Sequence, residues 1–103
     1  MVKRTPHHPL AATKSKFSTA ATLEITRTAF RSAADLGYCI EEIVGVVQSL
    51  EPADFVKSET AHNPPNARVW HYSYRTPADG MWLYLKFAGE TLVDVALVSF
   101  KEA

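Results

Sequence analysis

The chain has 103 residues, enough for one domain with one modest core, and we expect that domain to span residues 1–103. Hydrophobic residues make up 47% and charged residues 21% of the sequence, a globular composition that excludes wholesale disorder. The formal net charge is zero and no apolar run approaches the roughly 20 residues that span a bilayer, so composition favours neither a nucleic-acid binder nor a membrane protein.

The first eight residues are predicted to form an arm. They are basic, but no hydrophobic stretch follows them, which is not the pattern of a signal peptide. Pro9 can occupy the first position of a short helix over Leu10–Phe17, because a proline there loses no hydrogen bond. Thr22–Thr26 alternates polar and apolar residues and is predicted to be a short strand or an extended linker.

Two further helices are expected before the first long strand. Thr26 can cap a helix over Arg27–Leu36, and Gly37 can end it. The residues of this helix expected to point inward are Ala29, Phe30 and Ala33. The next helix ends before Pro52 and has an apolar stripe at helical spacing, formed by Ile40, Ile43, Val44, Val47 and Leu50. The single Cys39 cannot form an internal disulfide, which fits a cytoplasmic protein.

The second half of the chain has the pattern of antiparallel strands. Asp54–Glu59 is predicted to be a strand and Thr60–Asn66 a loop. One side of this strand is expected to carry Phe55, Lys57 and Glu59. A tight turn at Ala88–Glu90 leads into Thr91–Phe100, a nearly continuous apolar run typical of a central strand buried on both faces. Helices followed by a meander of antiparallel strands predict a two-layer α+β fold.

A hairpin between residues 68 and 87 is the strongest local prediction. The runs Arg68–Arg75 and Met81–Phe87 are rich in aromatic and β-branched residues, and they flank a Pro/Asp/Gly turn. Successive side chains of a strand point to opposite faces of the sheet. One face of the hairpin is therefore predicted to carry a polar and aromatic set, which consists of His71, Ser73, Arg75, Trp82, Tyr84 and Lys86.

The length of the turn decides which of these side chains oppose one another. A four-residue loop would place Ser73 opposite Tyr84 and His71 opposite Lys86. A two-residue loop at Asp79–Gly80 would shift the partners and leave the same side chains on the same face. The predicted face has no carboxylate, a combination that suits a phosphate-bearing, base-stacking ligand better than a metal ion or a sugar.

Five short motifs, in order over nearly the whole chain, resemble the MqsR family of bacterial toxins. They are Lys3–His7, Asp54–Ser58, Trp70 with Tyr74–Arg75, Tyr84–Lys86 and Val98–Glu102. The resemblance implies a RelE-like fold, in which N-terminal helices pack on a twisted and mostly antiparallel sheet.

The resemblance also implies an activity and partners. The family consists of toxins of type II toxin–antitoxin systems that act as mRNA interferases. These endoribonucleases cleave mRNA at GCU-type sites without the ribosome and without a metal ion, and so inhibit translation and growth. The expected partners are an mRNA substrate and a cognate MqsA-like antitoxin that binds zinc and DNA. No cofactor, no membrane contact and no direct DNA binding by this chain alone are expected.

Matching the motifs position by position implies catalytic roles for Lys57, Tyr84 and Lys101, with Arg75 in the same pocket region. The family position after the tryptophan is usually glutamine, whereas this chain has His71. The division of acid and base roles can therefore differ from that of the family.

Metal-free cleavage of RNA needs a base for the 2′-hydroxyl, an acid for the leaving 5′-oxygen, and cations for the charge on phosphorus. His71 is the residue of this face whose ordinary pKa suits proton transfer at neutral pH, and nearby Arg75 and Lys86 would keep it unprotonated as a base. Tyr84 can then be the acid, or the two can exchange roles. Arg75 can bind phosphate oxygens in bidentate fashion. The remaining expected RNA contacts are Lys86, Trp82 and Ser73.

The alternative interpretation is a non-catalytic module that binds RNA or a protein with the same face. In that case His71 is an ordinary strand residue, and Trp82 and Tyr84 form a packed cross-strand aromatic patch. The spacing of the histidines and of Cys39 matches no known pattern of metal ligands.

Overall fold

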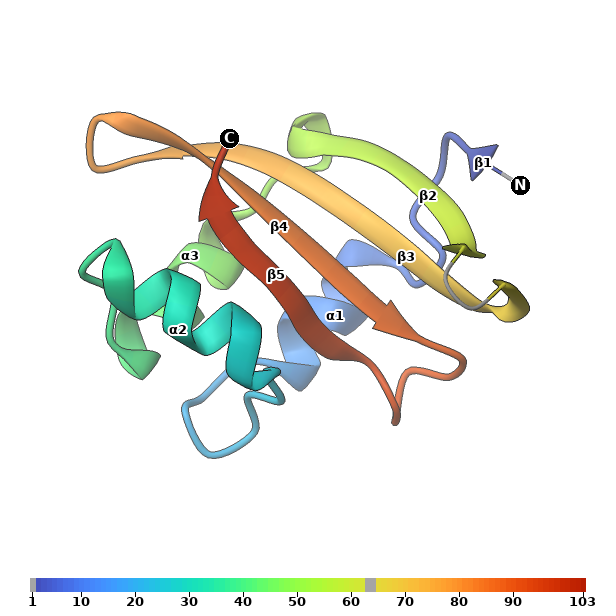
Figure 1. Ribbon diagram of the computed structural model, residues 1–103, viewed down its shortest axis with the longest axis horizontal. Coiled ribbons are helices and arrows are strands. Elements are labelled where there is room, and N and C mark those ends of the chain that lie inside the picture. Colours follow the sequence, from blue (N-terminus) through green and yellow to red (C-terminus); the bar gives the residue numbers. More distant parts are fainter. Residues whose placement is uncertain (1, 63–64) are drawn as a thin grey trace.

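A computed structural model describes residues 2–62 and 65–103, with side chains left undescribed at 61, 62 and 65–67. In this part of the chain, three α-helices and one 3₁₀ turn accompany a five-stranded antiparallel sheet, in which the strands follow the order of the sequence (Figure 1). The elements are β1 (Val2–Lys3), α1 (Leu10–Lys16), α2 (Arg27–Asp35), α3 (Ile40–Ser49), η1 (Pro52–Asp54), β2 (Phe55–His62), β3 (Pro65–Ala78), β4 (Met81–Gly89) and β5 (Ala96–Glu102). The predicted α+β class is confirmed. No helix in the described ranges has the length and apolar character to cross a membrane.

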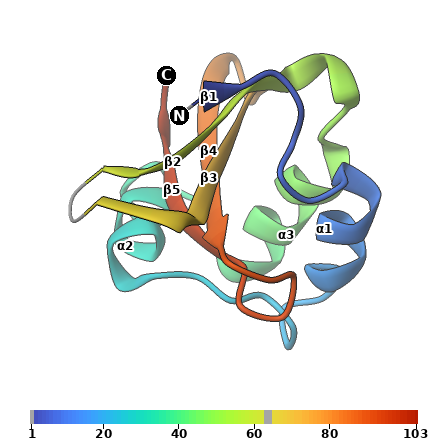
Figure 2. The ribbon, with the colours of Figure 1, turned by 90° about the vertical axis from the view of Figure 1, so that its right-hand side faces the viewer.

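The helices leave one face of the sheet open. α1 and α3 lie behind the sheet in Figure 1 and together on one side of it in Figure 2, while α2 runs beside β5 at the edge. The sheet contributes to the core the fully buried side chains Tyr72, Tyr74, Leu83, Leu85, Phe87, Leu97 and Phe100. The helices and their ends contribute Phe17, Ala33, Ile43, Val47 and Leu50. The opposite face of the sheet therefore carries the side chains available to a ligand.

The predicted helices are confirmed, with changes at single positions. Pro9 precedes α1 as its capping residue instead of occupying the first helical position. Thr26 caps α2, and its Oγ1 accepts a hydrogen bond from the Ala29 backbone N–H (3.2 Å). Gly37 ends α2 with a φ of 92°, a conformation that glycine adopts without strain. The inward placement of Phe30 was wrong, because 39% of its surface is exposed while Ala29 is buried.

The N-terminal arm forms more structure than the sequence predicted. Val2 in β1 pairs with Glu59 in β2. The Lys3 ammonium group donates a hydrogen bond to Nδ1 of His7 (2.9 Å) and lies 4.2 Å from the ring centre of Trp70, on which His7 also stacks. Burial, and then the Lys3 charge, lower the pKa of His7, which favours the neutral ring that can accept this bond.

Two strand boundaries differ from the predicted ones. The predicted loop over Thr60–Asn66 was wrong where the structure can test it, since residues 60–62 belong to β2 and 65–66 to β3, and residues 63–64 lie outside the described ranges. The predicted turn at Ala88–Glu90 was also displaced, because β4 continues to Gly89. A Cβ atom on Gly89 would lie 2.7 Å from the backbone of Val95, so this close approach requires glycine.

The last strand lies at the edge of the sheet, so its predicted central position was wrong, and it begins at Ala96 instead of Thr91. The edge of this strand that faces away from β4 is covered by the segment before α2. Leu97 bridges to Ile25, and its carbonyl oxygen accepts a hydrogen bond from the Thr26 N–H (3.0 Å). This cover and the packing of α2 explain an apolar strand at an edge position.

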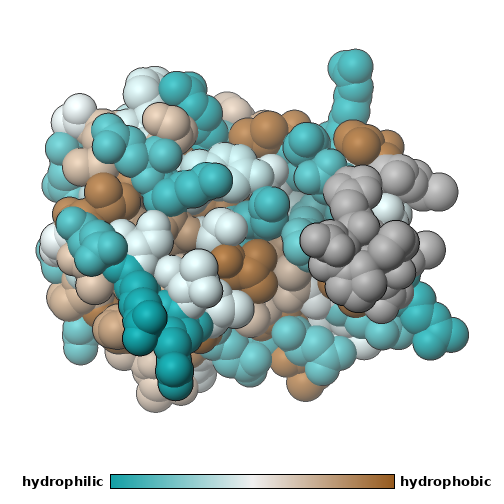
Figure 3. Space-filling model, in the orientation of Figure 1, coloured by the Kyte–Doolittle hydropathy of each residue, from teal (hydrophilic) through white to brown (hydrophobic). Residues whose placement is uncertain are grey.

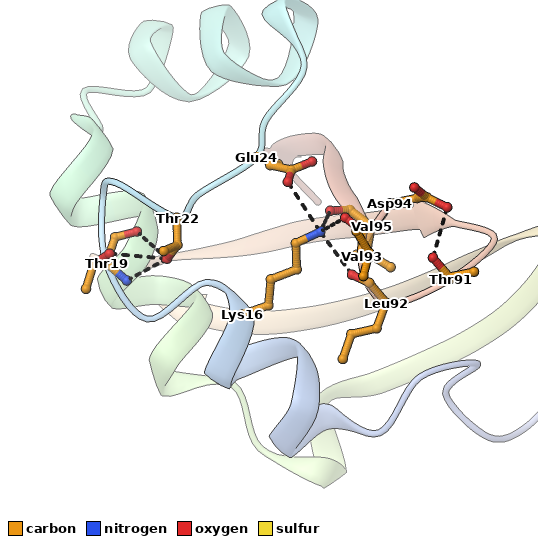
Figure 4. Close-up of polar contacts among 9 residues, drawn as sticks. All are labelled: Lys16, Thr19, Thr22, Glu24, Thr91, Leu92, Val93, Asp94 and Val95. Carbon is orange, nitrogen blue, oxygen red and sulfur yellow. Dashed lines mark hydrogen bonds and ion pairs between the residues drawn. The ribbon is translucent and has the colours of Figure 1, made fainter.

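The turn between β4 and β5 is anchored by one lysine of α1 (Figure 4). The Lys16 ammonium group donates hydrogen bonds to the carbonyl oxygens of Leu92 (3.0 Å), Val93 (2.6 Å) and Val95 (2.6 Å), and it lies 3.5 Å from a carboxylate oxygen of Glu24. These charge-assisted bonds fix the entrance to β5 relative to α1.

Replacing Lys16 with methionine is expected to lower the free energy of unfolding by about 1–3 kcal/mol, because three carbonyl groups lose a charged donor. Lys14 is a matched control on the same helix, since its ammonium group donates one bond, to the Leu50 carbonyl oxygen (2.9 Å). Urea unfolding of both variants would measure the difference. Equal losses for Lys16→Met and Lys14→Met would contradict the anchoring role.

Candidate functional site

The register of the open face is set by the turn between β3 and β4. This turn has two residues, Asp79 and Gly80, with φ values of 52° and 79°, which is the type I′ geometry that matches the twist of a hairpin. The Tyr38 hydroxyl donates a hydrogen bond to Oδ2 of Asp79 (2.5 Å). Burial, and then this carboxylate, raise the pKa of Tyr38 to about 12, so it remains a donor at neutral pH. The turn places Arg75 opposite Tyr84.

Side chains of the open face lie in rows that cross the strands. Row 1 contains Val2, Glu59, His71 and Ala88. Row 2 contains Lys57, Ser73, Lys86 and Ser99. Row 3 contains Arg75, Tyr84 and Lys101, and beyond it Pro77 lies opposite Trp82. Consecutive rows are about 7 Å apart along the strands, since each residue advances the chain by about 3.3 Å. The predicted shared face of the hairpin is therefore confirmed.

The partners on this face follow the two-residue turn, and the four-residue alternative was wrong. Ser73 lies opposite Lys86 and not opposite Tyr84, while His71 lies opposite Ala88. Tyr84 is consequently two rows from His71, about 13 Å along the strands. The signal for this register was present in the sequence, because an Asp-Gly pair between alternating runs is the strongest short-range sign of a two-residue turn.

A bulge in β2 brings Lys57 onto the open face. The register shifts between Phe55 and Lys57, so one extra residue, Val56, interrupts the alternation. Phe55 packs against the buried ring of Tyr74, with 5.6 Å between ring centres, whereas Lys57 lies in row 2. The prediction that Phe55 and Lys57 share a side was therefore wrong, because the bulge reverses the parity of the strand.

The open face contains a carboxylate, contrary to the sequence prediction. Glu59 lies in row 1, directly opposite His71, and its carboxylate is 3.4 Å from the Lys57 ammonium group. The Glu59 side chain is 19% exposed and that of Lys57 46%. The hairpin pattern does not include Glu59, because Glu59 lies on β2, which pairs with the other side of β3.

Row 3 and its neighbours combine cations with aromatic rings. The Arg75 guanidinium carbon lies 4.2 Å from the ring centre of Trp82, and Lys101 and Lys86 lie 5.4 Å and 5.9 Å from the ring centre of Tyr84. A shallow hollow of about 460 Å³ is lined by Tyr84, Lys86, Lys101, Glu102 and Ala103. The two ammonium groups and the aromatic ring of this hollow suit a phosphate-linked base, and the Glu102 carboxylate at its margin offsets part of the positive charge.

Ser73 lies between the two lysines of row 2. It is only 3% exposed, and its hydroxyl donates a hydrogen bond to the Lys57 carbonyl oxygen (3.3 Å). This hydrogen bond therefore links β3 to the β2 backbone at Lys57.

Figure 3 shows the open face in the orientation of Figure 1, with hydrophilic side chains spread across it and smaller hydrophobic patches between them. The basic residues of rows 2 and 3, Lys57, Arg75, Lys86 and Lys101, outnumber the one acidic residue of the three rows, Glu59. Among the side chains that the structure describes, no three His, Cys, Asp or Glu residues lie close enough together to hold a metal ion. The hairpin pattern predicted the shared face of Arg75 and Lys86, and the structure adds Lys57 from β2 and Lys101 from β5 to it.

Comparison with known proteins shows the family of the chain. The family model described as "Motility quorum-sensing regulator, toxin of MqsA" matches residues 5–102. The mRNA interferase toxin MqsR of Escherichia coli (strain K12) is 35% identical over 102 residues, and the match covers 99% of both chains. The chain therefore belongs to the MqsR toxin family.

Proposed function

We propose that this chain is the toxin of a type II toxin–antitoxin pair and acts as an endoribonuclease on mRNA. The observation that carries the proposal is the basic and aromatic open face in a chain of the MqsR toxin family, one relative of which is named an mRNA interferase. Cleavage needs neither the ribosome nor a metal ion. It leaves a 2′,3′-cyclic phosphate and a 5′-hydroxyl, and it inhibits translation and growth.

The scissile phosphate binds over row 2. Lys57 and Lys86 flank the short side chain of Ser73 there, and they offer one ammonium group from each side. The Arg75 guanidinium group, in the next row, can add a bidentate contact to the phosphate oxygens. One donor placed at developing charge contributes roughly 10²–10³ to the rate, so these cations stabilise the transition state as well as bind substrate.

His71 and Tyr84 transfer the protons, and they lie in the rows on either side of row 2. In-line displacement puts the attacking 2′-oxygen and the leaving 5′-oxygen on opposite sides of phosphorus. One residue can therefore reach each oxygen from its own row. Lys101, beside the Tyr84 ring, adds positive charge where the 5′-oxygen departs. Each placed proton-transfer group is worth roughly 10²–10⁴ in rate.

Bases next to the cleaved bond stack on the aromatic side chains beyond row 2. Trp82 is exposed, and the Arg75 guanidinium group supports its ring. Stacking of one base on an aromatic side chain contributes roughly 1–3 kcal/mol to binding and tolerates different sequences. Preference for GCU-type sites then depends on hydrogen bonds to base edges around Tyr84 and Lys86.

The partner that controls this activity is an MqsA-like antitoxin that binds zinc and DNA. The description of the family as toxin of MqsA supports this proposal. Co-expression of the chain with such an antitoxin is expected to restore growth and to yield a stable complex on purification.

Cleavage of a long unstructured RNA by the purified protein in EDTA tests the proposed activity. We expect fragments with 5′-hydroxyl and cyclic-phosphate ends at a short recurrent motif. Chemical mapping of both ends, with enzyme-free RNA and His71→Ala protein as controls, distinguishes this activity from contaminating nucleases. Salt-dependent binding of the RNA without any cleavage would refute the proposal and favour a non-catalytic RNA-binding module.

A further inference from the structure

Glu59 occupies the one position of the open face that directly faces His71 from β2. Residues opposite one another in an antiparallel pair have Cβ atoms about 4.5–5.5 Å apart, so the carboxylate can reach the imidazole. The Glu59 backbone is paired on both sides, with Val2 in β1 and with His71 in β3. The position of Glu59 relative to His71 is therefore fixed by three strands.

The other charged residues of the three described rows are cations. They are Lys57 from β2, Lys86 from β4, Arg75 from β3 and Lys101 from β5, all in rows 2 and 3. Each of them disfavours a positive charge on the imidazole. Within the three rows, Glu59 supplies the negative charge that favours it, and Lys57 already lies 3.4 Å from that carboxylate.

We propose that Glu59 is a positioning residue that acts through His71 and makes His71 the base of the reaction. The proposal rests on the proposed function. His71 takes the proton of the 2′-hydroxyl, and the 2′-oxygen forms its bond to phosphorus as the bond from phosphorus to the 5′-oxygen breaks. Tyr84 gives its hydroxyl proton to the departing oxygen. Proton exchange with water then restores both side chains.

The register supports this division of roles. Glu59 is beside His71 in row 1, whereas Tyr84 stands two rows away between Arg75 and Lys101. A carboxylate next to an imidazole orients the ring and stabilises the imidazolium that forms when the ring accepts a proton. A phosphate bound over row 2 also attracts Lys57, which leaves the Glu59 charge to act on His71.

The test compares Glu59→Gln, Glu59→Asp and the parent protein, with Glu24→Gln as a matched control. Glu24 is also an acid paired with a lysine, 3.5 Å from the Lys16 ammonium group, but it lies outside the open face. Two measurements are made on each folded protein. One is the NMR titration of the His71 ring, assigned with His71→Gln, and the other is the pH dependence of kcat/KM for RNA cleavage.

Loss of the carboxylate removes a charge that favours imidazolium, so the titration midpoint of His71 must fall in Glu59→Gln. We expect the midpoint and the acidic limb of the pH profile to move down by about one pH unit. We also expect kcat/KM on the plateau to fall by about 10²-fold, the low end for a proton-transfer group. Glu59→Asp should recover most of both effects, and Glu24→Gln should match the parent.

A folded Glu59→Gln protein with the parent's His71 midpoint and the parent's pH profile would overturn the proposal. A uniform loss of rate at every pH, not relieved by aspartate, would also overturn it and leave Glu59 a structural residue. If the parent protein cleaves no RNA, the proposed function fails instead, and the NMR midpoints still decide whether Glu59 acts on His71.

Discussion

Replacing His71 with alanine is expected to lower kcat/KM for RNA cleavage by about 10²–10⁴-fold while RNA binding persists. In the proposed mechanism, His71 supplies proton transfer from row 1, whereas Lys57, Lys86 and Arg75 supply the contacts to the phosphate from rows 2 and 3. Cleavage rates and fluorescence anisotropy, measured in the same buffer with the same RNA, would separate the two effects.

His71→Gln separates the titration of this side chain from its hydrogen bonding, which His71→Ala does not. Glutamine keeps the hydrogen-bonding capacity of the side chain and is the residue that the resemblance leads us to expect at this position, but it does not titrate. We therefore expect His71→Gln to bind RNA as the parent does and to lose the acidic limb of the pH profile, which reflects the imidazole. If His71→Ala and Tyr84→Phe both cleave RNA like the parent, the site assignment is wrong, while membership in the MqsR toxin family stands.

The shared face of the hairpin could be predicted because alternation along a strand is a local property of the backbone. For any even-numbered turn, Tyr84 and Lys86 of the second strand join the face that carries His71 on the first strand. The exact partners depend on the turn length, which only the Asp79-Gly80 pair indicates in the sequence. Helix ends were also predictable at Thr26 and Gly37, because capping and positive φ require particular residue types.

Other parts of the site depend on tertiary structure and leave no local pattern. Phe55 and Val56 are both apolar, so the sequence does not reveal which of them leaves the core at the bulge. The bulge places Lys57 and Glu59 on the same face as His71. It therefore also determines which charges surround the proposed base. The apolar character of the last strand likewise does not reveal whether another strand or the segment before α2 covers its edge.

Phe87 is expected to be the side chain on which the stability of this face depends most. It is fully buried on β4 next to Lys86, and its ring centre lies 5.4 Å from that of Tyr72, 5.6 Å from that of Phe17 and 6.0 Å from that of Tyr74. Removing such a ring leaves a cavity between α1 and the sheet. The aromatic contacts that hold β3 and β4 to the helix layer would be lost with it.

Phe87→Ala is therefore expected to lower the free energy of unfolding by about 3–5 kcal/mol, a large part of the roughly 5–15 kcal/mol typical of a domain. Phe30→Ala makes the same chemical change at a site that is 39% exposed on α2, and it should cost less than about 1 kcal/mol. Thermal and urea unfolding of both variants would measure the contrast. Losses of similar size would mean that the core is not centred on Phe87. Because Lys86 and Phe87 are consecutive on β4 and point to opposite faces, a large loss for Phe87→Ala alone would mean that packing of the buried face stabilises the strand that presents Lys86 in row 2.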